Sequence, residues 1–303
     1  MSEMNSIVIG KSDTVMKMLA AIFADGHILI EDFPGLAKTL IARSFSSVLG
    51  CDFRRIQFTP DLLPSDVTGA SVLNRNSNRF ELRKGPVFTN LLLGDEINRA
   101  PPKTQSALLE AMQERQVTIE GETHRLERPF IVMATQNPIE YEGTYPLPEA
   151  QLDRFMMKIS VGYPDANDEA SVLRRRRERG KDEFDVPAVT DRQSLLSMQR
   201  ETEKVHVSDE MEKYIVDIVG ATRSHPSVEI GASPRGSLSL MKLSMAGACM
   251  KGRDFVTPDD VKEFAAVALA HRLILKPDPW LRGVKPEKII AELLEQVRVP
   301  KVD

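Results

Sequence analysis

Cysteine is nearly absent from this chain, and histidine is scarce. The two cysteines, Cys51 and Cys249, lie far apart and in no Cys-x-x-Cys pairing, so nothing indicates a disulfide framework or a cysteine zinc site. The five histidines show no His-Glu-x-x-His or other ligand spacing. We therefore interpret both cysteines as small buried hydrophobes in a reducing compartment.

A strong charge of one sign and long apolar runs are also missing. The 40 Lys and Arg residues nearly balance 44 Asp and Glu, so the formal net charge is −4, which does not suggest a protein that coats nucleic acid. No stretch approaches about 18 unbroken apolar residues, and the first residues have neither a basic nor a long apolar region. We expect a soluble, cytoplasmic protein without membrane insertion. Its 303 residues suffice for two domains, and no internal repeat is visible.

A phosphate-loop pattern organises the first half of the chain. Residues 27–50 read HILIEDFPGLAKTLIARSFSSVLG, which is a short apolar run, a Pro/Gly turn, Lys38-Thr39 and an amphipathic helix. In a strand, glycine turn and helix of this kind, backbone N–H groups and the positive end of the helix dipole hold polyphosphate. Lys38 would reach the β- and γ-phosphates, and Thr39 would place its hydroxyl on Mg²⁺.

The loop departs from the pattern Gly-x-x-x-x-Gly-Lys-Ser/Thr at two positions. Asp32 replaces the first glycine and Ala37 the second. We expect Ala37 to change little if its φ stays negative, and Asp32 to point away from phosphate or to be paired. On this stretch alone, an ordinary strand-turn-helix with a surface lysine stays open as an alternative.

Acidic and amide side chains follow two further apolar runs. Three leucines at 91–93 predict a strand buried in a parallel sheet, and it ends in Asp95-Glu96. Asp95 can hold the water shell of Mg²⁺, and Glu96 can orient and deprotonate the attacking water. Asn137, after a strand at 130–134, can reach the γ-phosphate or that water. The alternatives are a solvated strand end for the acids and a turn residue for Asn137.

Three other segments have a local signal. Residues 7–10 and the periodic run after them predict a loop and a helix with an apolar surface near the nucleotide base. Leu62 and Leu63, in an insert flanked by prolines, are either a core plug or an exposed contact. Residues 71–85 predict a hairpin, and residues 116–135 predict a hairpin that runs into a buried strand.

Strand signals disappear from Val186 onward, and helix starts recur at Thr190, Ser208, Thr257 and Pro286. We therefore expect residues 1–185 to form an α/β core and residues 186–303 a separate helical domain.

Arginines stand out at three places. Arg154 follows a short helix, where it is displayed at a domain edge or pairs with a neighbour such as Asp153. The run 174–177 is interpreted as a solvated helix end that complements the helix dipole. Arg235 follows the expected N-cap Ser233, where a cation is unfavourable unless an anion is nearby. Arg235 is therefore a better candidate for binding phosphate than the arginine run 174–177.

Five segments, EDFPGLAKT, LLLGDEINRAP, ATQNP, LPEAQLDRF and ASPRGS, occur in this order. Together they resemble the MoxR-type AAA+ ATPases over nearly the whole chain. The resemblance implies an αβα parallel-sheet phosphate-loop core followed by an all-α lid, with ATP/ADP and Mg²⁺ as ligands. It also implies ATP hydrolysis between subunits of a hexameric ring and a chaperone-like action on partner proteins, frequently proteins with a von Willebrand factor A domain.

The resemblance implies a role for each matching residue. Glu96 would be the catalytic base, Asn137 sensor 1, Arg154 an arginine finger given to the neighbouring subunit, and Arg235 sensor 2. Thr39 and Asp95 would contact the metal. The segment around Leu62 and Leu63 corresponds to the helix-2 insert, and residues 117–128 to the hairpin before sensor 1. The predicted nucleotide contacts are Ile9, Gly10, Pro34, Gly35, Leu36, Ala37, Lys38, Thr39 and Leu40.

Two other functions stay open at this point. One is a nucleotide-dependent binding switch with negligible turnover, which Asp32 favours and the presence of both Glu96 and Arg154 disfavours. The other is a DNA or RNA motor on the same core. The sequence pI near 5.9 and the mixed-charge hairpin speak against such a motor, and so does the lack of an added basic or zinc domain.

Overall fold

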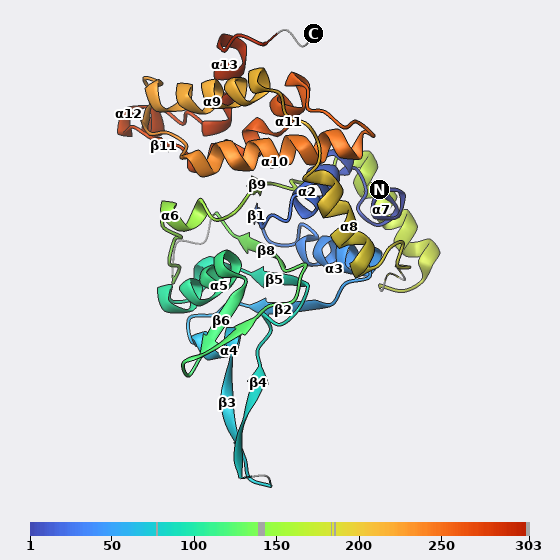
Figure 1. The fold of residues 1–303 in the computed structure, drawn as a ribbon. Helices are drawn as coiled ribbons and strands as arrows, with labels where there is room; N and C mark the ends of the chain where they lie inside the picture. The colour runs from blue at the N-terminus through green and yellow to red at the C-terminus, as the bar shows by residue number, and fades with distance from the viewer. Residues whose placement is uncertain (77, 139–142, 183, 185, 301–303) are drawn as a thin grey trace. The chain divides into compact units, whose positions relative to one another are not determined.

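A computed structural model of the chain describes residues 1–76, 78–138, 143–182, 184 and 186–300 (Figure 1). Contacts divide the chain into two compact units. The first unit comprises residues 1–16, 27–147 and 159–196, and the second comprises residues 17–26, 148–158 and those from 197 onward. The domain boundary expected after residue 185 stays a prediction.

The first unit contains most of a five-stranded sheet in the order β2-β5-β8-β1-β9. Its strands are β1 (Ile28–Glu31), β2 (Phe53–Gln57), β5 (Leu91–Asp95), β8 (Ile131–Gln136) and β9 (Met157–Ile159). The pairs β2-β5, β5-β8 and β8-β1 are parallel, and β5 is buried along its whole length. Near-continuous apolar runs are what a parallel sheet covered on both faces requires. The predicted parallel α/β core is therefore confirmed.

The strand register brings distant segments of the chain together. Gln57 pairs with Asp95 across β2 and β5, and Glu31 pairs with Gln136 across β1 and β8. Because parallel strands end at the same edge of a sheet, the residues that follow β1, β5 and β8 meet there.

Helices and short turns connect these strands. α3 (Lys38–Val48) buries Ile41, Phe45 and Val48 on one face, as predicted. Residues 8–10 form the expected connection, but a helix that the sequence did not indicate, α1, precedes them. The other helices of this part are α1 (Ser2–Ile7), α4 (Pro64–Thr68), η1 (Ile97–Arg99), α5 (Pro102–Glu114) and α7 (Ala166–Arg179), while α2 (Ser12–Phe23) and α8 (Arg192–Thr202) each contain residues of both units.

Two hairpins extend from the first unit. β3 (Gly69–Asn74) and β4 (Arg79–Lys84) form a long antiparallel arm that projects away from the sheet (Figure 1). β6 (Gln116–Ile119) and β7 (Glu122–Arg125) form the second hairpin, directly before β8. Both predicted hairpins are confirmed, although Ser77, in the predicted turn of the first, lies outside the described residues.

The second unit is mainly helical. Its elements are α6 (Glu149–Leu152), α9 (Asp209–Ser224), β10 (Val228–Ile230), α10 (Pro234–Met250), α11 (Pro258–Leu269), η2 (Ala270–Arg272), β11 (Ile274–Leu275), α12 (Pro277–Leu281) and α13 (Pro286–Gln296). Ser208 caps α9, and Thr257 with Asp260 forms a capping box on α11, as predicted. None of the helices in the described ranges is long and apolar enough to cross a bilayer.

Two expectations about the helical part are wrong. The cap of α8 is Asp191 rather than Thr190, because the Asp191 carboxylate accepts the backbone N–H of Ser194 at 2.8 Å. Strands also do not end with the core, since β10 and β11 pair antiparallel in the second unit. These strands contain three and two residues, which is too short for an alternating pattern to mark them.

Candidate nucleotide-binding site

The phosphate loop lies between the end of β1 and the start of α3. Gly35 has a φ of 82°, and a Cβ placed there would meet nothing within 4 Å, so its backbone borders open space. Ala37 is the N-cap of α3 and has a φ of 54°. The condition under which Ala37 would change little, a negative φ, is therefore not met. Because the left-handed conformation costs a residue with a Cβ roughly 1 kcal/mol, the loop is strained directly before Lys38.

Asp32 is engaged by backbone of the same unit. Its carboxylate is buried and accepts the N–H groups of Val161 at 2.6 Å and Gly162 at 2.7 Å. The Ser160 hydroxyl and the Phe33 N–H also donate to it, each at 3.1 Å. The expectation that this acid is paired is confirmed. Four donors hold it, which explains how a carboxylate is accommodated at the first glycine position of a phosphate loop.

Lys38 folds over its own loop. Its ammonium donates to the carbonyl oxygens of Asp32 at 2.7 Å and Phe33 at 3.1 Å. Thr39 is the next residue of α3 and is half-buried. Both lie at a cavity of about 390 Å³. The residues that line this cavity are Pro34, Gly35, Leu36, Ala37, Lys38, Thr39, Arg55, Asp95, Glu96 and Asn137.

Asp95 ends β5 and is fixed on both carboxylate oxygens. Oδ1 accepts the hydroxyl of Thr135 at 2.6 Å. Oδ2 accepts Nη2 of Arg55 at 2.6 Å and Nε of the same guanidinium at 3.2 Å. Thr135 and Arg55 belong to the flanking strands β8 and β2, so the sheet itself orients this acid. The sequence pattern did not single out either partner.

Glu96 adopts a left-handed conformation with a φ of 57°, immediately after β5. Its backbone N–H donates to the Thr135 hydroxyl at 2.8 Å. Its Oε2 accepts from Gln57 Nε2 at 2.7 Å and from Arg99 at 3.0 Å. The unusual backbone angle turns the chain so that consecutive acids both reach the cavity. Asn137, which follows β8, is buried at its wall.

A second cavity, of about 410 Å³, adjoins the phosphate loop. Apolar residues of the chain start and of the loop line part of it, and the predicted position of the nucleotide base beside them stays a prediction. Ile9 and Leu40 line it, whereas Gly10 is not among its lining residues. Arg175, Arg176 and Arg179 also line it, so part of the arginine-rich helix end borders this cavity. α7 itself buries no residue, which agrees with the predicted solvated helix end, and the helix ends at Gly180 in the left-handed conformation.

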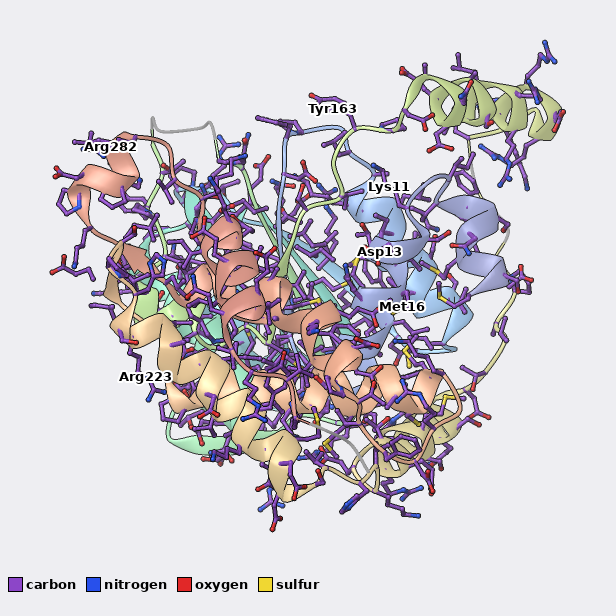
Figure 2. The ribbon with its side chains drawn as sticks, turned by 90° about the horizontal axis from the view of Figure 1, so that it is seen from above. Lys11, Asp13, Met16, Tyr163, Arg223 and Arg282 are labelled. Atoms are coloured by element: carbon purple, nitrogen blue, oxygen red, sulfur yellow. The ribbon has the colours of Figure 1, made fainter. Side chains whose placement is uncertain are left out.

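The segment at 160–164 borders the second cavity, which Val161, Gly162 and Pro164 help to line. Lys11 Nζ donates to the carbonyl oxygen of Tyr163 at 2.8 Å (Figure 2). The Tyr163 ring stacks on Phe33 of the phosphate loop, with ring centroids 6.1 Å apart. Together with the Asp32 hydrogen bonds, these contacts join the loop to the connection that leads into α7.

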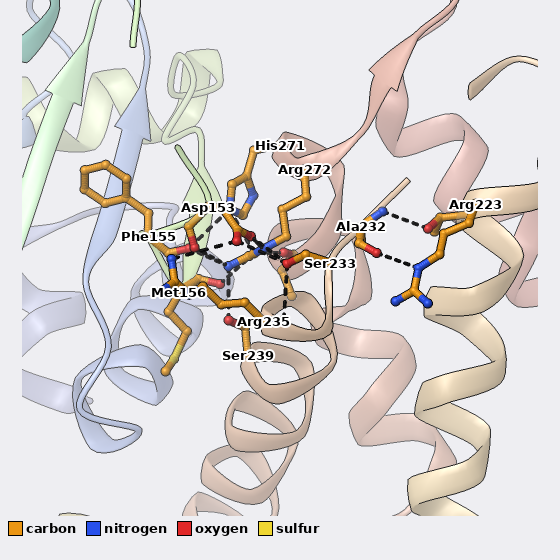
Figure 3. Close-up of polar contacts among 12 residues, drawn as sticks. Asp153, Phe155, Met156, Arg223, Ala232, Ser233, Arg235, Ser239, His271 and Arg272 are labelled. Atoms are coloured by element: carbon orange, nitrogen blue, oxygen red, sulfur yellow. Dashed lines mark hydrogen bonds and ion pairs between the residues drawn. The ribbon is translucent and has the colours of Figure 1, made fainter. Parts of the chain in front are cut away.

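Arg235 lies in the second unit, in the first turn of α10 (Figure 3). Its Nη1 lies 3.8 Å from Oδ2 of Asp153. The hydroxyl of the N-cap Ser233 donates to the same carboxylate at 3.1 Å. The anion that a cation needs at this helix end is therefore supplied by the protein itself. Arg154, next in the chain, is half-buried, and its guanidinium has no hydrogen bond or ion pair with any residue that the structure describes.

Arg272 is the residue of this cluster that sequence reasoning missed. Its side chain is 2% exposed, and its Nε binds Oδ1 of Asp153 at 2.7 Å. Its Nη2 donates to the carbonyl oxygen of Phe155 at 2.8 Å and to the Ser239 hydroxyl at 3.1 Å (Figure 3). It thereby ties the segment that carries Arg154 to α10 and η2. Nothing in the spacing of charges around residue 272 distinguishes it from a surface arginine.

The donor set at the first cavity suits magnesium. Thr39 offers a hydroxyl and Asp95 a carboxylate, and Mg²⁺ is held by one or two such oxygens together with phosphates and water. No group of three or more His, Cys, Asp or Glu in the described ranges could hold a metal ion by itself. The residues present therefore fit a metal that arrives with phosphate.

A phosphate loop on a parallel sheet, with paired acids on a neighbouring strand and a separate helical unit, defines an AAA-type nucleotide-binding protein. Comparison with known proteins agrees. Residues 27–157 match the ATPase family associated with various cellular activities (AAA), and residues 220–293 match the AAA lid domain. The chain belongs to the MoxR-type AAA ATPase family.

Individual relatives match over nearly the full length. The chain is 50% identical to the uncharacterized protein YeaC of Bacillus subtilis, covering 98% of this chain and 92% of that protein. It is 43% identical to chaperone MoxR1 of Mycobacterium tuberculosis, covering 99% and 81% respectively. A crystal structure of a protein from Cytophaga hutchinsonii matches with a TM-score of 0.92 at 44% identity, covering 99% of this chain and 93% of that one.

Proposed function

We propose that the protein binds ATP in the phosphate-loop cavity and hydrolyses it to ADP and phosphate. The supporting observation is that Lys38, Thr39, Asp95, Glu96 and Asn137, which are far apart in the sequence, line one cavity. Membership of an ATPase family gives this constellation its reaction class. The apolar cavity next to the loop, about 410 Å³ in volume, has a size suited to the base and ribose.

Each side chain has a distinct task in this proposal. Lys38 leaves its two loop carbonyls to bind the β- and γ-phosphates, while Thr39 and Asp95 contact Mg²⁺. When bound, the metal neutralises charge on the phosphates. Glu96 orients the attacking water and accepts its proton, and Asn137 holds that water or the γ-phosphate.

Arg154 and Arg235, both in the second unit, extend the proposal to an assembly of subunits. Arg154 would act as an arginine finger on the nucleotide of a neighbouring subunit, since no partner within the described chain occupies its guanidinium. Arg235 would exchange its 3.8 Å contact with Asp153 for a nucleotide phosphate. We propose a homo-oligomeric ring, expected to be a hexamer, that uses ATP to remodel or activate a partner protein. The relative named chaperone MoxR1 supports the chaperone-like class.

Steady-state ADP production against protein concentration tests this proposal. We expect specific activity to rise with concentration in the wild type, because the site is completed by a neighbour. Arg154→Ala should stay near zero, since an arginine finger contributes about 10³- to 10⁵-fold in phosphate-loop enzymes. Lys38→Ala is the control without nucleotide binding. A specific activity that is flat with concentration and indifferent to Arg154 would contradict the shared site.

A binding switch with negligible turnover is the second candidate, and one contact favours it. Gln57 and Arg99 both donate to the same Glu96 oxygen, so the proposed base is already engaged. Glu96→Gln separates the two functions. In an ATPase this variant binds ATP but turns over at least about 100-fold more slowly. In a switch, wild type and variant show the same negligible turnover and the same nucleotide affinity.

A further inference from the structure

Arg55 places a cation on the carboxylate that we propose as a metal contact. Nη2 and Nε of Arg55 both point to Oδ2 of Asp95, at 2.6 and 3.2 Å. The other oxygen, Oδ1, is taken by the hydroxyl of Thr135. The Asp95 side chain is only 13% exposed, so its negative charge is poorly screened by water and needs a counter-charge. Arg55 supplies it.

The guanidinium also has a second acceptor within reach. Nη2 of Arg55 donates to Oε1 of Gln57 at 2.6 Å, and Gln57 in turn donates to Glu96 at 2.7 Å. The Arg55 side chain is 46% exposed and can therefore move without opening a packed core. If the bond to Asp95 breaks, Gln57 still holds the guanidinium at the rim of the cavity.

The strand geometry makes this arrangement specific to one arginine. Residues 55 and 57 of β2 lie on the same face of the sheet, and Gln57 is in register with Asp95. Arg54 precedes Arg55 but faces the opposite side, and its side chain makes no hydrogen bond or ion pair with any residue in the described ranges. Two adjacent arginines on one strand thus differ only in whether they face the acids.

We propose that Arg55 is the counter-ion of Asp95 in the metal-free protein, and that Mg²⁺ must displace it when nucleotide is loaded. Arg55 then sets the Mg²⁺ concentration at which the site fills. Two cations on one carboxylate oxygen repel each other, so the metal gains less from Asp95 while the guanidinium stays. Once released onto Gln57, Arg55 remains a positive charge beside the phosphates. The proposal rests on the proposed ATP site and specifies how its metal binding is regulated.

Arg55→Gln should therefore change two affinities in opposite directions. Without metal, nucleotide binding should weaken about three- to tenfold, because the cavity loses a cation. The Mg²⁺ concentration needed for half-maximal tightening of nucleotide binding should fall by a similar factor, because Asp95 is no longer paired. Damage to the site would weaken both, so the opposite signs identify the counter-ion role.

Titration with a fluorescent N-methylanthraniloyl ADP measures both affinities without turnover, first in EDTA and then at increasing Mg²⁺. Electron paramagnetic resonance of Mn²⁺ added with ADP gives an independent readout of metal binding. Arg54→Gln, which removes the same charge from the other face, is the matched control and should behave as wild type. If wild type binds no nucleotide under either condition, the proposed function fails. If wild type binds but Arg55→Gln matches Arg54→Gln, only the role of Arg55 is wrong.

Discussion

At the scale of single residues, Asp32 shows how a departure from a motif is stabilised by distant chain. The first glycine of a phosphate loop is replaced by a carboxylate, whose acceptors are filled by backbone donors at 161 and 162 and by the Ser160 hydroxyl. The loop is thereby fixed to a segment about 130 residues later in the sequence. Such a contact makes Asp32 a support of the loop rather than a defect in it.

Asp32→Gly restores the motif but should weaken nucleotide binding, because the N–H groups of Val161 and Gly162 lose their acceptor. Each unsatisfied buried donor costs about 1–3 kcal/mol. Asp32→Asn should show a smaller loss, since one amide oxygen remains. Denaturant unfolding measures the loss of unfolding free energy, and nucleotide titration measures the loss of affinity. The exposed Asp52→Asn is the control. Tighter nucleotide binding by the glycine variant would show that the carboxylate hinders the loop.

Ala37 marks the limit of prediction at this scale. The motif located the loop and its lysine because strand, glycine and helix signals are local. It did not reveal that Ala37 takes a φ of 54°. The backbone angle follows from closing the turn between β1 and α3, which residue type alone does not determine.

At the scale of elements, the sequence predicted the helices and strands that strong local patterns determine. It did not predict the features that depend on tertiary contacts. The triple leucine of β5 and the buried face of α3 were both identified. The pairing of β10 with β11 and the role of Arg272 were not, because each depends on residues that meet only in the folded chain. For the candidate site, the residues that line the cavity were largely predicted. Their polar partners on β2, Arg55 and Gln57, were not.

Arg272→Lys tests whether the contacts of Arg272 with residues 153–156, which we call the clamp, matter for function. A lysine can pair with Asp153 but cannot also serve Phe155 and Ser239, which the planar fork contacts together. We expect the second unit to lose roughly 2–4 kcal/mol of unfolding free energy. We also expect ATP turnover to fall, because Arg154 is less well positioned, while nucleotide affinity stays near wild type. Thermal unfolding and ADP production measure this.

The exposed Arg282→Lys is the control, since it makes the same chemical change at the surface of the same unit. Equal stability and turnover in the two variants would contradict a positioning role for Arg272. Lower stability with unchanged turnover, measured where both variants are folded, would make the clamp purely structural.

At the scale of the whole molecule, each compact unit is built from stretches that are not consecutive in the sequence. Residues 17–26 and 148–158 belong by contact to the unit formed mainly by the C-terminal helices. The loss of strand signals near residue 186 could not reveal this, because membership depends on long-range contacts rather than on composition. The segment that carries Arg154 thus belongs to the same unit as Arg235 and Arg272.

Each unit also contains a buried neutral histidine. His27 Nδ1 accepts the N–H of Val132, so Nε2 carries the proton and donates to the carbonyl oxygen of Met112, both at 3.0 Å. Burial, with the nearby Arg115 charge, lowers the pKa of His27 to about 3. Burial and the adjacent Arg272 likewise hold the pKa of His271, in the second unit, well below its usual value.

These histidines predict an acid-labile fold. Below pH 6.5 each of these two histidines binds a proton in the unfolded chain but stays neutral in the native state. Their contribution to the free energy of unfolding is therefore present above pH 6.5 and is lost as the pH falls toward 3. Each buried histidine should contribute a slope of about 1.4 kcal/mol per pH unit in this window. His27→Gln, whose amide offers both a donor and an acceptor, should remove one such slope from denaturant unfolding measured at pH 6.5, 5.5 and 4.5. His206→Gln, which makes the same change at an exposed position, is the matched control. The slope, rather than absolute stability, is the readout, because the glutamine lowers stability at every pH. Identical slopes in wild type and His27→Gln would mean that His27 is protonated in the folded protein, which its two backbone partners do not permit.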